Sequence, residues 1–288
     1  MPGAVRVDPL TGVPVVVTSG RQSRPNLPAE GCPFCPGGLE APEPYHVRWF
    51  ANRWPSLPDR RAEVVLYTSD HDATFWSLGA AVAEKVVRLW AERTTVLGAR
   101  PDVSYVLVFE NRGPEIGATI THPHGQVYAF DAVPPVPTTE LASATCALCG
   151  IDPGRRLVIA VGDWRAWVPE AAAWPFELLL APVEHVADLP AVVKGDEVAA
   201  GSLARVLVDV LERLDRLFGE PMPYMLWFHQ RPTDGGDWPI AHVHAHVAPV
   251  FRKSGTMRYV AAGELGSGVY FNPVDPEEAA ERLRRAIS

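Results

Sequence analysis

The sequence predicts an α+β fold made of two pseudo-symmetric halves, residues 1–140 and 141–288, each an antiparallel sheet with one long helix. First, two C-x-x-C pairs are each followed, 36 residues after the second cysteine, by a histidine. Second, each half then reaches an H-x-H string. Features repeated in the same order indicate an internal duplication. These residues are Cys32, Cys35, His71, His122 and His124 in the first half, and Cys146, Cys149, His185, His244 and His246 in the second.

The secondary-structure patterns of the two halves also repeat. Each half has a strand-like apolar run, then a long stretch of helical periodicity, then a second strand-like run. The cysteines and single histidines are offset by 114 residues and the H-x-H strings by 122, which predicts an eight-residue insertion in the second half. A proline-rich stretch places the boundary near residue 140, and Asp275-Pro276 predicts a terminal helix. The predicted runs are 64–67, 76–97 and 103–110 in the first half, and 178–181, 195–218 and 224–229 in the second.

Composition excludes several classes of function. The chain has 26 Lys+Arg and 34 Asp+Glu among its 288 residues, a formal net charge of −8. Nucleic-acid binding needs a basic stripe along the phosphates, so we expect no nucleic-acid partner. No apolar run reaches the roughly 20 residues that span a bilayer, so we expect no membrane partner. The first residues lack the apolar core of a signal peptide, from which we expect a cytoplasmic protein.

The cysteines predict zinc. Without a secretory signal, C-x-x-C pairs indicate metal or redox sites rather than disulfides, and Gly/Pro-rich turns follow both pairs where a redox motif would open a helix. A lone histidine at a strand end is more often structural, but the duplicated spacing favours a ligand role for both. A closed zinc site needs four nitrogen or sulfur ligands in a tetrahedron. The predicted sites are Cys32, Cys35, His71 and His122, and Cys146, Cys149, His185 and His244.

The string at residues 122–126, His-Pro-His-Gly-Gln, predicts a nucleophile beside the first metal site. Residues i and i+2 of a strand face the same side, so His122 can bind metal while His124 reacts. A neutral imidazole attacks phosphorus readily, and its phosphoramidate can be passed on. The preceding segment 110–121 offers glycine turns, an amide, hydroxyls and a guanidinium for phosphate, and Gln126 can hydrogen-bond a phosphoryl oxygen.

The same string, preceded by Glu-Asn-Arg-Gly at residues 110–113, resembles the signature of the galactose-1-phosphate uridylyltransferases of the histidine-triad superfamily. The resemblance implies two histidine-triad-like halves and a homodimer. It also implies a ping-pong exchange of UMP between UDP-glucose and galactose 1-phosphate through a covalent adduct on His124. Further strings resemble the family, at residues 8–12, 21–25, 52–55 and 174–177, in the segment from His244 to Arg252, and in the C-terminal helix.

The resemblance implies a role for each matching residue. Catalysis falls to His124 and Gln126. Gln126 and Thr119 hold the phosphoryl oxygens, Asn111 and Arg112 flank the phosphates next to the turn at Gly117, and Asn52 contacts the nucleoside. Arg21 and Arg24 lie near the phosphates and reach the site of the partner subunit. Glu264 contacts the hexose, although Phe271 stands where these enzymes have a glutamine.

Several alternatives stay open. Some uridylyltransferases bind iron through one glutamate and three histidines, which correspond here to Glu140, His229, His244 and His246. The two-zinc arrangement resembles instead the ADP-glucose phosphorylases, which transfer AMP to phosphate. The three alternating histidines that begin at His242 also fit a nucleotide hydrolase with its site in the second half. A zinc-stapled binding module without catalysis is the last alternative, in which His124 would be replaceable.

Overall fold

One nine-stranded sheet forms the centre of the molecule. The structure, a computed structural model, describes residues 4–19, 31–194 and 197–287. The strands of this sheet are β3 (Arg48–Ala51), β4 (Ala62–Leu66), β5 (Tyr105–Arg112), β6 (His124–Phe130), β7 (Leu157–Val161), β8 (Trp164–Trp167), β9 (Leu178–Pro182), β10 (Tyr224–His229) and β11 (His244–Pro249). Their order is β3-β4-β6-β5-β10-β11-β9-β8-β7, and all neighbours are antiparallel.

The strand order shows the duplication directly. Strands β3-β4-β6-β5 of the first half are mirrored by β8-β9-β11-β10 of the second, and the halves meet where β5 pairs with β10. Glu110 lies opposite Leu226 in this central pair, and Arg112 lies opposite Tyr224. The predicted α+β class and the two related halves are confirmed, with one addition: the two sheets join edge to edge into one. The boundary at residue 140 stays a prediction.

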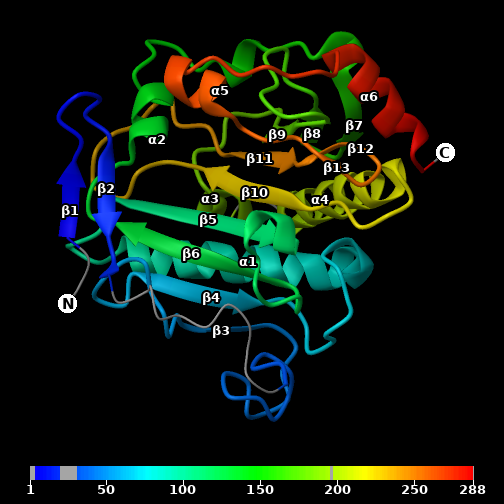
Figure 1. The fold of residues 1–288 in the computed structure, drawn as a ribbon. Coiled ribbons are helices and arrows are strands. Elements are labelled where there is room, and N and C mark those ends of the chain that lie inside the picture. Colours follow the sequence, from blue (N-terminus) through cyan, green and yellow to red (C-terminus); the bar gives the residue numbers. More distant parts are fainter. Residues whose placement is uncertain (1–3, 20–30, 195–196, 288) are drawn as a thin grey trace.

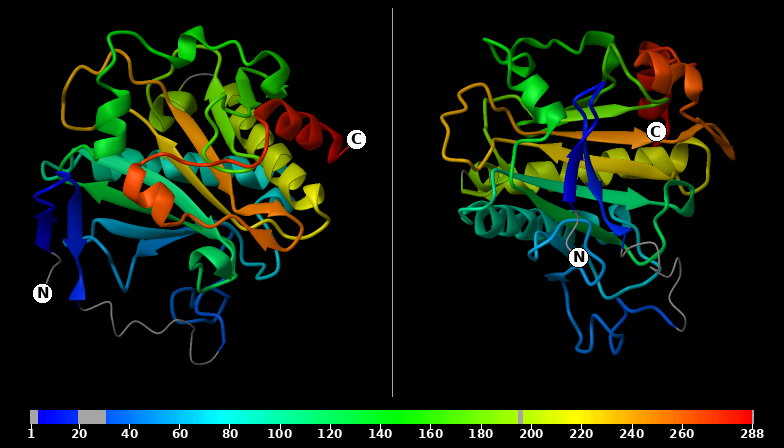
Figure 2. Two further views of the ribbon diagram at one scale, coloured as in Figure 1. Left: turned by 45° about the horizontal axis from the view of Figure 1, so that its top comes forward. Right: turned by 60° about the vertical axis from the view of Figure 1, so that its left-hand side comes forward.

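Two long helices, α1 (Gly79–Gly98) and α4 (Glu197–Leu217), cover the same face of the sheet (Figure 1, Figure 2). They match the predicted helices to within three residues at each end. On α1 the buried residues Ala83, Val86, Val87 and Trp90 recur at helical spacing, which gives the helix one apolar face. Trp90 contacts Phe228 of β10 at 5.4 Å between ring centroids, so the halves share one core.

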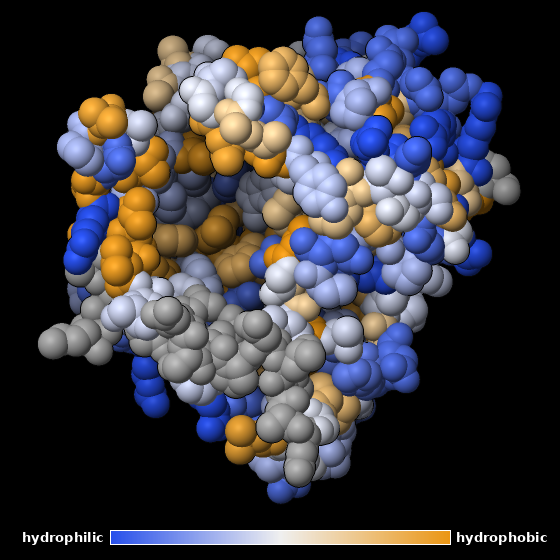
Figure 3. All heavy atoms as spheres, in the orientation of Figure 1, coloured by the Kyte–Doolittle hydropathy of each residue, from blue (hydrophilic) through white to orange (hydrophobic). Residues whose placement is uncertain are grey.

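The other face of the sheet is open and carries the less buried side chains. On β6 the burial alternates, with His124, Gln126 and Tyr128 partly exposed and the residues between them buried. Figure 3 shows this face from the front, hollowed beside the apolar side chains of the hairpin formed by β1 (Ala4–Val7) and β2 (Pro14–Val17). The side chains of His124, Gln126 and Tyr128 therefore lie on the face of the sheet away from the helices.

Short elements complete the described part of the chain. The predicted terminal helix is present, with Asp275 as its N-cap accepting from the backbone N–H groups of Glu277 and Glu278 at 2.9 and 3.1 Å. No described helix is long and apolar enough to cross a membrane. The remaining elements are β12 (Phe251–Lys253), β13 (Thr256–Met257), α2 (Pro135–Glu140), α3 (Leu189–Lys194), α5 (Ala262–Ser267), α6 (Pro276–Arg285) and the 3-10 turns η2 (Trp76–Leu78), η3 (Pro114–Ile116), η4 (Leu148–Gly150) and η5 (Gly154–Arg156).

Candidate active site and metal centres

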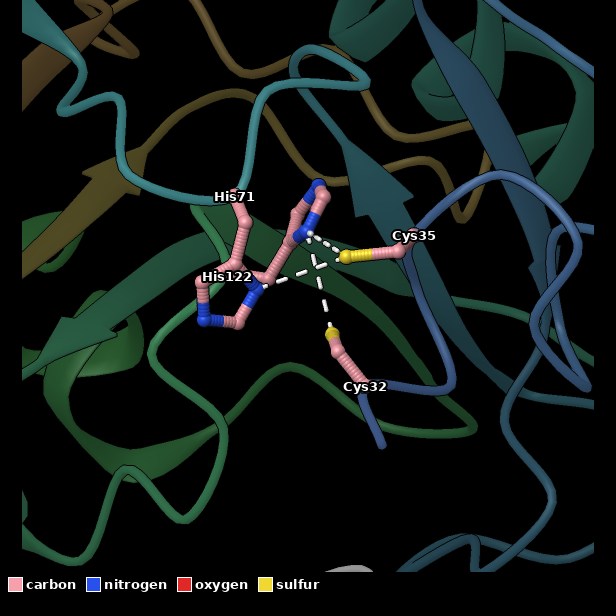
Figure 4. Close-up of side chains that lie close together, drawn as sticks. All are labelled: Cys32, Cys35, His71 and His122. Carbon is pink, nitrogen blue, oxygen red and sulfur yellow. Dashed lines mark hydrogen bonds between the residues drawn. The ribbon is translucent and has the colours of Figure 1, made fainter. Parts of the chain in front are cut away.

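The first predicted metal site is assembled by the fold. Cys32, Cys35, His71 and His122 direct their sulfur and ring nitrogen atoms toward one point (Figure 4), and the four ligand atoms lie within 4.8 Å of one another. The Sγ atom of Cys35 lies 3.5 Å from Nδ1 of His71 and 3.7 Å from Nδ1 of His122. Zinc–sulfur and zinc–nitrogen bonds of ordinary length put tetrahedral ligands roughly 3.3–3.8 Å apart. The residues therefore fit zinc.

Hydrogen bonds on the far side of the His122 ring fix its tautomer. Its Nε2 lies 2.8 Å from the carbonyl oxygen of Thr68 and 2.9 Å from the hydroxyl of Tyr45. A proton on Nε2 donates to the Thr68 carbonyl and leaves the lone pair on Nδ1, which faces the cysteines. Burial lowers the pKa of His122, which favours the neutral, metal-binding ring.

The second cysteine pair meets His242, and the assignment of His244 as its ligand is wrong. Nδ1 of His242 lies 3.4 Å from Sγ of Cys146 and 3.6 Å from Sγ of Cys149, which in turn lies 3.2 Å from Nδ1 of His185. These four ligand atoms form a second tetrahedral cluster within 4.8 Å. His242 also repeats the backbone bond of His122, because its Nε2 lies 3.2 Å from the carbonyl oxygen of Pro182.

His244 is predicted as this ligand only when the histidines of the two halves are matched in the wrong register. The second half has three alternating histidines, and matching the last two to His122 and His124 gave the offset of 122. The structure instead matches His122 to His242 and His124 to His244, since strands β6 and β11 begin at the second histidine of each pair. The offset is 242 − 122 = 120, so the second half gains 120 − 114 = 6 residues rather than eight.

His244 belongs to a third cluster, with Glu140, His229 and His246, whose ligand atoms also lie within 4.8 Å of one another. Glu140, at the end of α2, places a carboxylate oxygen 2.9 Å from Nδ1 of His229 and 3.6 Å from Nε2 of His244. Burial and the neighbouring histidines lower the pKa of His244 to about 3, so its ring is neutral. The cluster borders a cavity of about 240 Å³. Because His242 serves the cysteines, the two second-half clusters do not compete for one histidine.

A backbone hydrogen bond orients the ring of His124. Its Nδ1 lies 2.7 Å from the carbonyl oxygen of His122, so the proton on Nδ1 donates there and the lone pair is on Nε2, as the predicted nucleophile requires. The edge of the Phe34 ring packs against the imidazole at 5.1 Å between centroids. Gln126 lies two residues along the strand on the same face, and its side-chain oxygen accepts from Nδ2 of Asn52 at 3.4 Å. The predicted site residues Asn52 and Gln126, far apart in the sequence, are therefore neighbours in the fold.

A cavity of about 40 Å³ lies beside His124. One wall is residues 73–75, and the other is residues 110–114 with parts of the connection to β6. Phe109 pairs with Gln126, and continuing this antiparallel register places Asn111 across from His124. Gly117, which ends the turn η3 with φ at 81°, and Thr119 belong to that connection. The contacts of Asn111, Gly117 and Thr119 with a substrate stay predictions.

Arg112 lies on the helix-covered face, since it alternates with Asn111 and pairs with the buried Tyr224. Its Nη1 donates to a carboxylate oxygen of Asp215 on α4 at 2.6 Å. The side chain borders the cavity beside His124, but its guanidinium is engaged by the second half. Its predicted contact with the phosphates stays a prediction.

Glu110 is a buried acid that the motif did not assign a role. Burial raises the pKa of Glu110 to about 7, partly opposed by the hydrogen bond from the hydroxyl of Tyr224 and by the charge of Arg112. Tyr224 donates to Oε1 at 2.7 Å. A Cβ atom on Gly125, next to the nucleophile, would lie 2.2 Å from the hydroxyl oxygen of Tyr67, so only glycine fits there. A lone acid inside an apolar strand run was the sequence signal for this network.

Three further residues are predicted to bind substrate. Arg21 and Arg24 are outside the described residues. Glu264 is buried, and its carboxylate pairs with Arg258 and accepts from the backbone N–H groups of Phe271 at 3.0 Å and Ala261 at 3.2 Å. These bonds tie down the C-terminal segment, and the hexose contact of Glu264 stays a prediction.

The chain matches two family descriptions in the order of its halves. Residues 53–134 match "Galactose-1-phosphate uridyl transferase, N-terminal domain", and residues 151–288 match the C-terminal domain of the same family. A galactose-1-phosphate uridylyltransferase of Thermotoga maritima is 35% identical over 312 residues, covering 97% of each chain.

Solved structures show the same fold. A uridylyltransferase structure superposes with a TM-score of 0.89 at 31% identity and covers 98% of each chain. The crystal structure of an ADP-glucose phosphorylase from Arabidopsis thaliana with bound ADP-glucose superposes with a TM-score of 0.78 at 23% identity, covering 98% of this chain and 99% of the other. The second likeness shows the shared fold alone.

Proposed function

The chain belongs to the galactose-1-phosphate uridylyltransferase family, a family of nucleotidyltransferases, and we propose that it exchanges UMP between UDP-glucose and galactose 1-phosphate through His124. One observation carries the proposal. His124 presents Nε2 on the open face, in the half whose neighbouring positions hold the neutral amides Gln126 and Asn52. Amides bind phosphoryl oxygens without competing as nucleophiles or supplying an acid to protonate the leaving group.

The chemistry follows from this geometry in two displacements. Nε2 of His124 attacks the α-phosphorus of the nucleotide sugar, the N–P bond forms as the P–O bond to the sugar phosphate breaks, and sugar 1-phosphate leaves. A phosphate oxygen of the second sugar phosphate then attacks the same phosphorus, and the N–P bond breaks to return neutral His124. The Nδ1 bond to the His122 carbonyl stabilises the imidazolium character that develops in each transition state.

Gln126 is the predicted oxyanion ligand. Its side-chain oxygen accepts from Asn52, so in this proposal its amide NH₂ donates to a phosphoryl oxygen. An N–H donor aimed at the phosphoryl oxygens is worth most in the transition state, where their charge grows. Asn52 then acts through Gln126 as well as on the nucleoside, and Asn111, Gly117 and Thr119 surround the phosphates.

The metals have a positional role in this proposal. Cys32, Cys35, His71 and His122 would hold one zinc ion, and Cys146, Cys149, His185 and His242 a second. Zinc there would cross-link each cysteine loop to one histidine after β4 or β9 and to another just before β6 or β11, and would supply structural rigidity. His122 is the link between metal and chemistry, since its carbonyl oxygen accepts from His124. Glu140, His229, His244 and His246 suit a harder divalent ion such as iron.

The proposed assembly is a homodimer in the cytoplasm. Apolar side chains lie exposed at two places, Leu10 at the tip of the β1–β2 hairpin (93% exposed) and Leu265 and Phe271 near the C-terminus (76% and 66%). A two-stranded hairpin is marginal by itself, so contact with a second copy would stabilise it. Arg21 and Arg24 would complete the substrate site of the partner in such a dimer.

ADP-glucose phosphorylase activity is the second candidate. The observation that favours it is the second Cys₂His₂ cluster, because a two-zinc arrangement resembles that branch. It would use the same His124 adduct with AMP in place of UMP and phosphate as the acceptor. Hydrolysis at the second half is disfavoured, because His244 is engaged in the Glu140 cluster and His246 stacks on Trp227 at 4.9 Å.

Isotope exchange tests the proposal. Labelled glucose 1-phosphate should enter UDP-glucose with no second sugar phosphate present, because the first displacement is reversible by itself. We expect exchange in the wild type and in His244→Ala, and none in His124→Ala. Labelled glucose 1-phosphate entering only ADP-glucose supports the phosphorylase candidate, and exchange that survives in His124→Ala overturns the mechanism.

A further inference from the structure

Asp215 lies at the end of helix α4 in the second half, behind both walls of the cavity beside His124. Its Oδ1 atom accepts from Nη1 of Arg112 at 2.6 Å and from the backbone N–H of Met222 at 2.9 Å. Its Oδ2 atom accepts from the indole N–H of Trp76 at 2.7 Å. The side chain is 11% exposed, so these bonds are screened little by solvent.

The three donors belong to three segments around the active site. Arg112 ends β5 and belongs to the wall formed by residues 110–114, and Trp76 directly follows the wall formed by residues 73–75. Met222 lies in the connection between α4 and β10. One carboxylate therefore joins both first-half walls to the second half.

The wall at residues 110–114 packs closely against the second half at Gly113. A Cβ atom on Gly113 would lie 2.6 Å from Cβ of Pro223, the residue after Met222. Gly113 also has φ at 108°, a conformation that favours glycine. The wall therefore lies close to the second half at Gly113, where a side chain would clash with Pro223.

We propose that Asp215 is a positioning residue for nucleotidyl transfer, through which the second half sets the shape of the first-half cavity around His124. The kinetic test of this proposal, which measures formation of the His124 adduct, rests on the proposed function. Asn111, next to Arg112, faces the nucleophile, so a shift of this wall displaces it relative to the phosphates. A misplacement of about 1 Å in a reacting geometry costs roughly 100-fold in rate.

The test compares Asp215→Asn with Asp209→Asn in the full-length, zinc-loaded protein. Asparagine keeps the size but has one acceptor oxygen in place of two and no charge. Asp209 is the matched control, an acid on the same helix that pairs with Arg213 at 2.5 Å and does not border the cavity. The rate constant of His124 adduct formation at saturating UDP-glucose is measured well below the melting temperature, with Tm and zinc content recorded for each variant.

We expect Asp215→Asn to slow adduct formation about 10- to 100-fold while KM changes far less, because positioning acts on the reacting geometry. Asp209→Asn should keep the wild-type rate. Arg112→Gln should slow the reaction too, and adding Asp215→Asn to it should give little further loss, since the two side chains act as one unit. A wild-type rate in Asp215→Asn, or losses that multiply in the double variant, overturns the proposal.

Crystal structures separate this inference from the proposed function. If the wild type forms no adduct with either nucleotide sugar, the proposed function fails, and the position of the walls still decides the role of Asp215. A displacement of residues 73–76 and 110–114 in the Asp215→Asn structure supports the positioning role. Walls that superpose on those of the wild type overturn it.

Discussion

His124 and His244 hold the same place in the two halves, each with Nδ1 2.7 Å from the carbonyl oxygen of the histidine two residues earlier. Their surroundings differ completely. Two residues after His124 the strand carries Gln126, whereas two residues after His244 it carries His246. His244 also lies directly opposite His229 of the neighbouring strand β10. The two halves thus share one backbone hydrogen bond, which orients the proposed nucleophile in the first half and a histidine of the Glu140 cluster in the second.

The amide of Gln126 should matter more for rate than for binding. Gln126→Ala removes the donor aimed at the phosphoryl oxygens and should slow adduct formation by about 10²- to 10³-fold, as for other oxyanion ligands. Gln126→Glu has the same shape but adds a negative charge beside the phosphates, and it should be slower still. Single-turnover kinetics with UDP-glucose measures both. Variants that form the adduct at the wild-type rate would remove Gln126 from the mechanism.

Replacing His242 should cost the second thiolate-bound metal, whereas replacing His244 should not. Cobalt(II) exchanged into the protein gives a thiolate-to-metal absorption band only where cysteine binds it, so the band counts the two Cys₂His₂ clusters. We expect His242→Ala to lose about half of the band, since each cluster uses two thiolates, and His244→Ala to retain all of it. The reverse pattern would restore His244 as the ligand of Cys146 and Cys149.

Gly125 should tolerate no side chain unless Tyr67 is shortened. Gly125→Ala would place a methyl group 2.2 Å from the Tyr67 hydroxyl oxygen and 3.0 Å from the Phe109 carbonyl oxygen. Overpacking of this kind costs about 1–3 kcal/mol of unfolding free energy. Adding Tyr67→Phe removes the nearer contact and should recover part of the loss in chemical denaturation. A double variant as unstable as the sum of the single variants would show that the two residues do not clash.

Glu110 should make stability fall as pH rises. Burial raises the pKa of Glu110 to about 7, above its value in the unfolded chain, so the folded state binds the extra proton between these two values. Stability from this group is fully present below the unfolded pKa and is lost as pH rises through 7. Relative to Glu110→Gln, the wild type should lose up to about 3 kcal/mol of unfolding free energy between pH 4 and pH 8.

Denaturation curves of the two proteins across this pH range check the prediction. The other titrating groups cancel in the difference, because both proteins contain them. A difference that does not change with pH would mean that Glu110 ionises alike in the folded and unfolded chains.

The helices and the first metal cluster could be predicted because their signals are local or duplicated. The apolar periodicity of α1 and α4 fixes each helix within its own segment. The 36-residue spacing identified His71 and His185 as partners of the cysteines, and the structure brings both beside them.

Other features depend on pairings that no local pattern specifies. Three alternating histidines allow two alignments of the repeat, and the start of β11 at His244 and the contacts of His242 with the cysteines select between them. The joining of both sheets through β5 and β10 is an edge contact between segments more than 100 residues apart. The bonds of Asp215 to Arg112 and Trp76 likewise follow from tertiary packing, since side chains of opposite halves meet only once the sheet has formed.

The most direct test of the central claim is the intact mass of the protein after acid-free quenching with UDP-glucose, and separately with ADP-glucose. Wild type, His124→Ala and His244→Ala are compared in their zinc-loaded form. The account predicts a mass increase of one UMP with UDP-glucose in the wild type and in His244→Ala, and none in His124→Ala. A UMP adduct that persists in His124→Ala, or an adduct formed only from ADP-glucose, would contradict it.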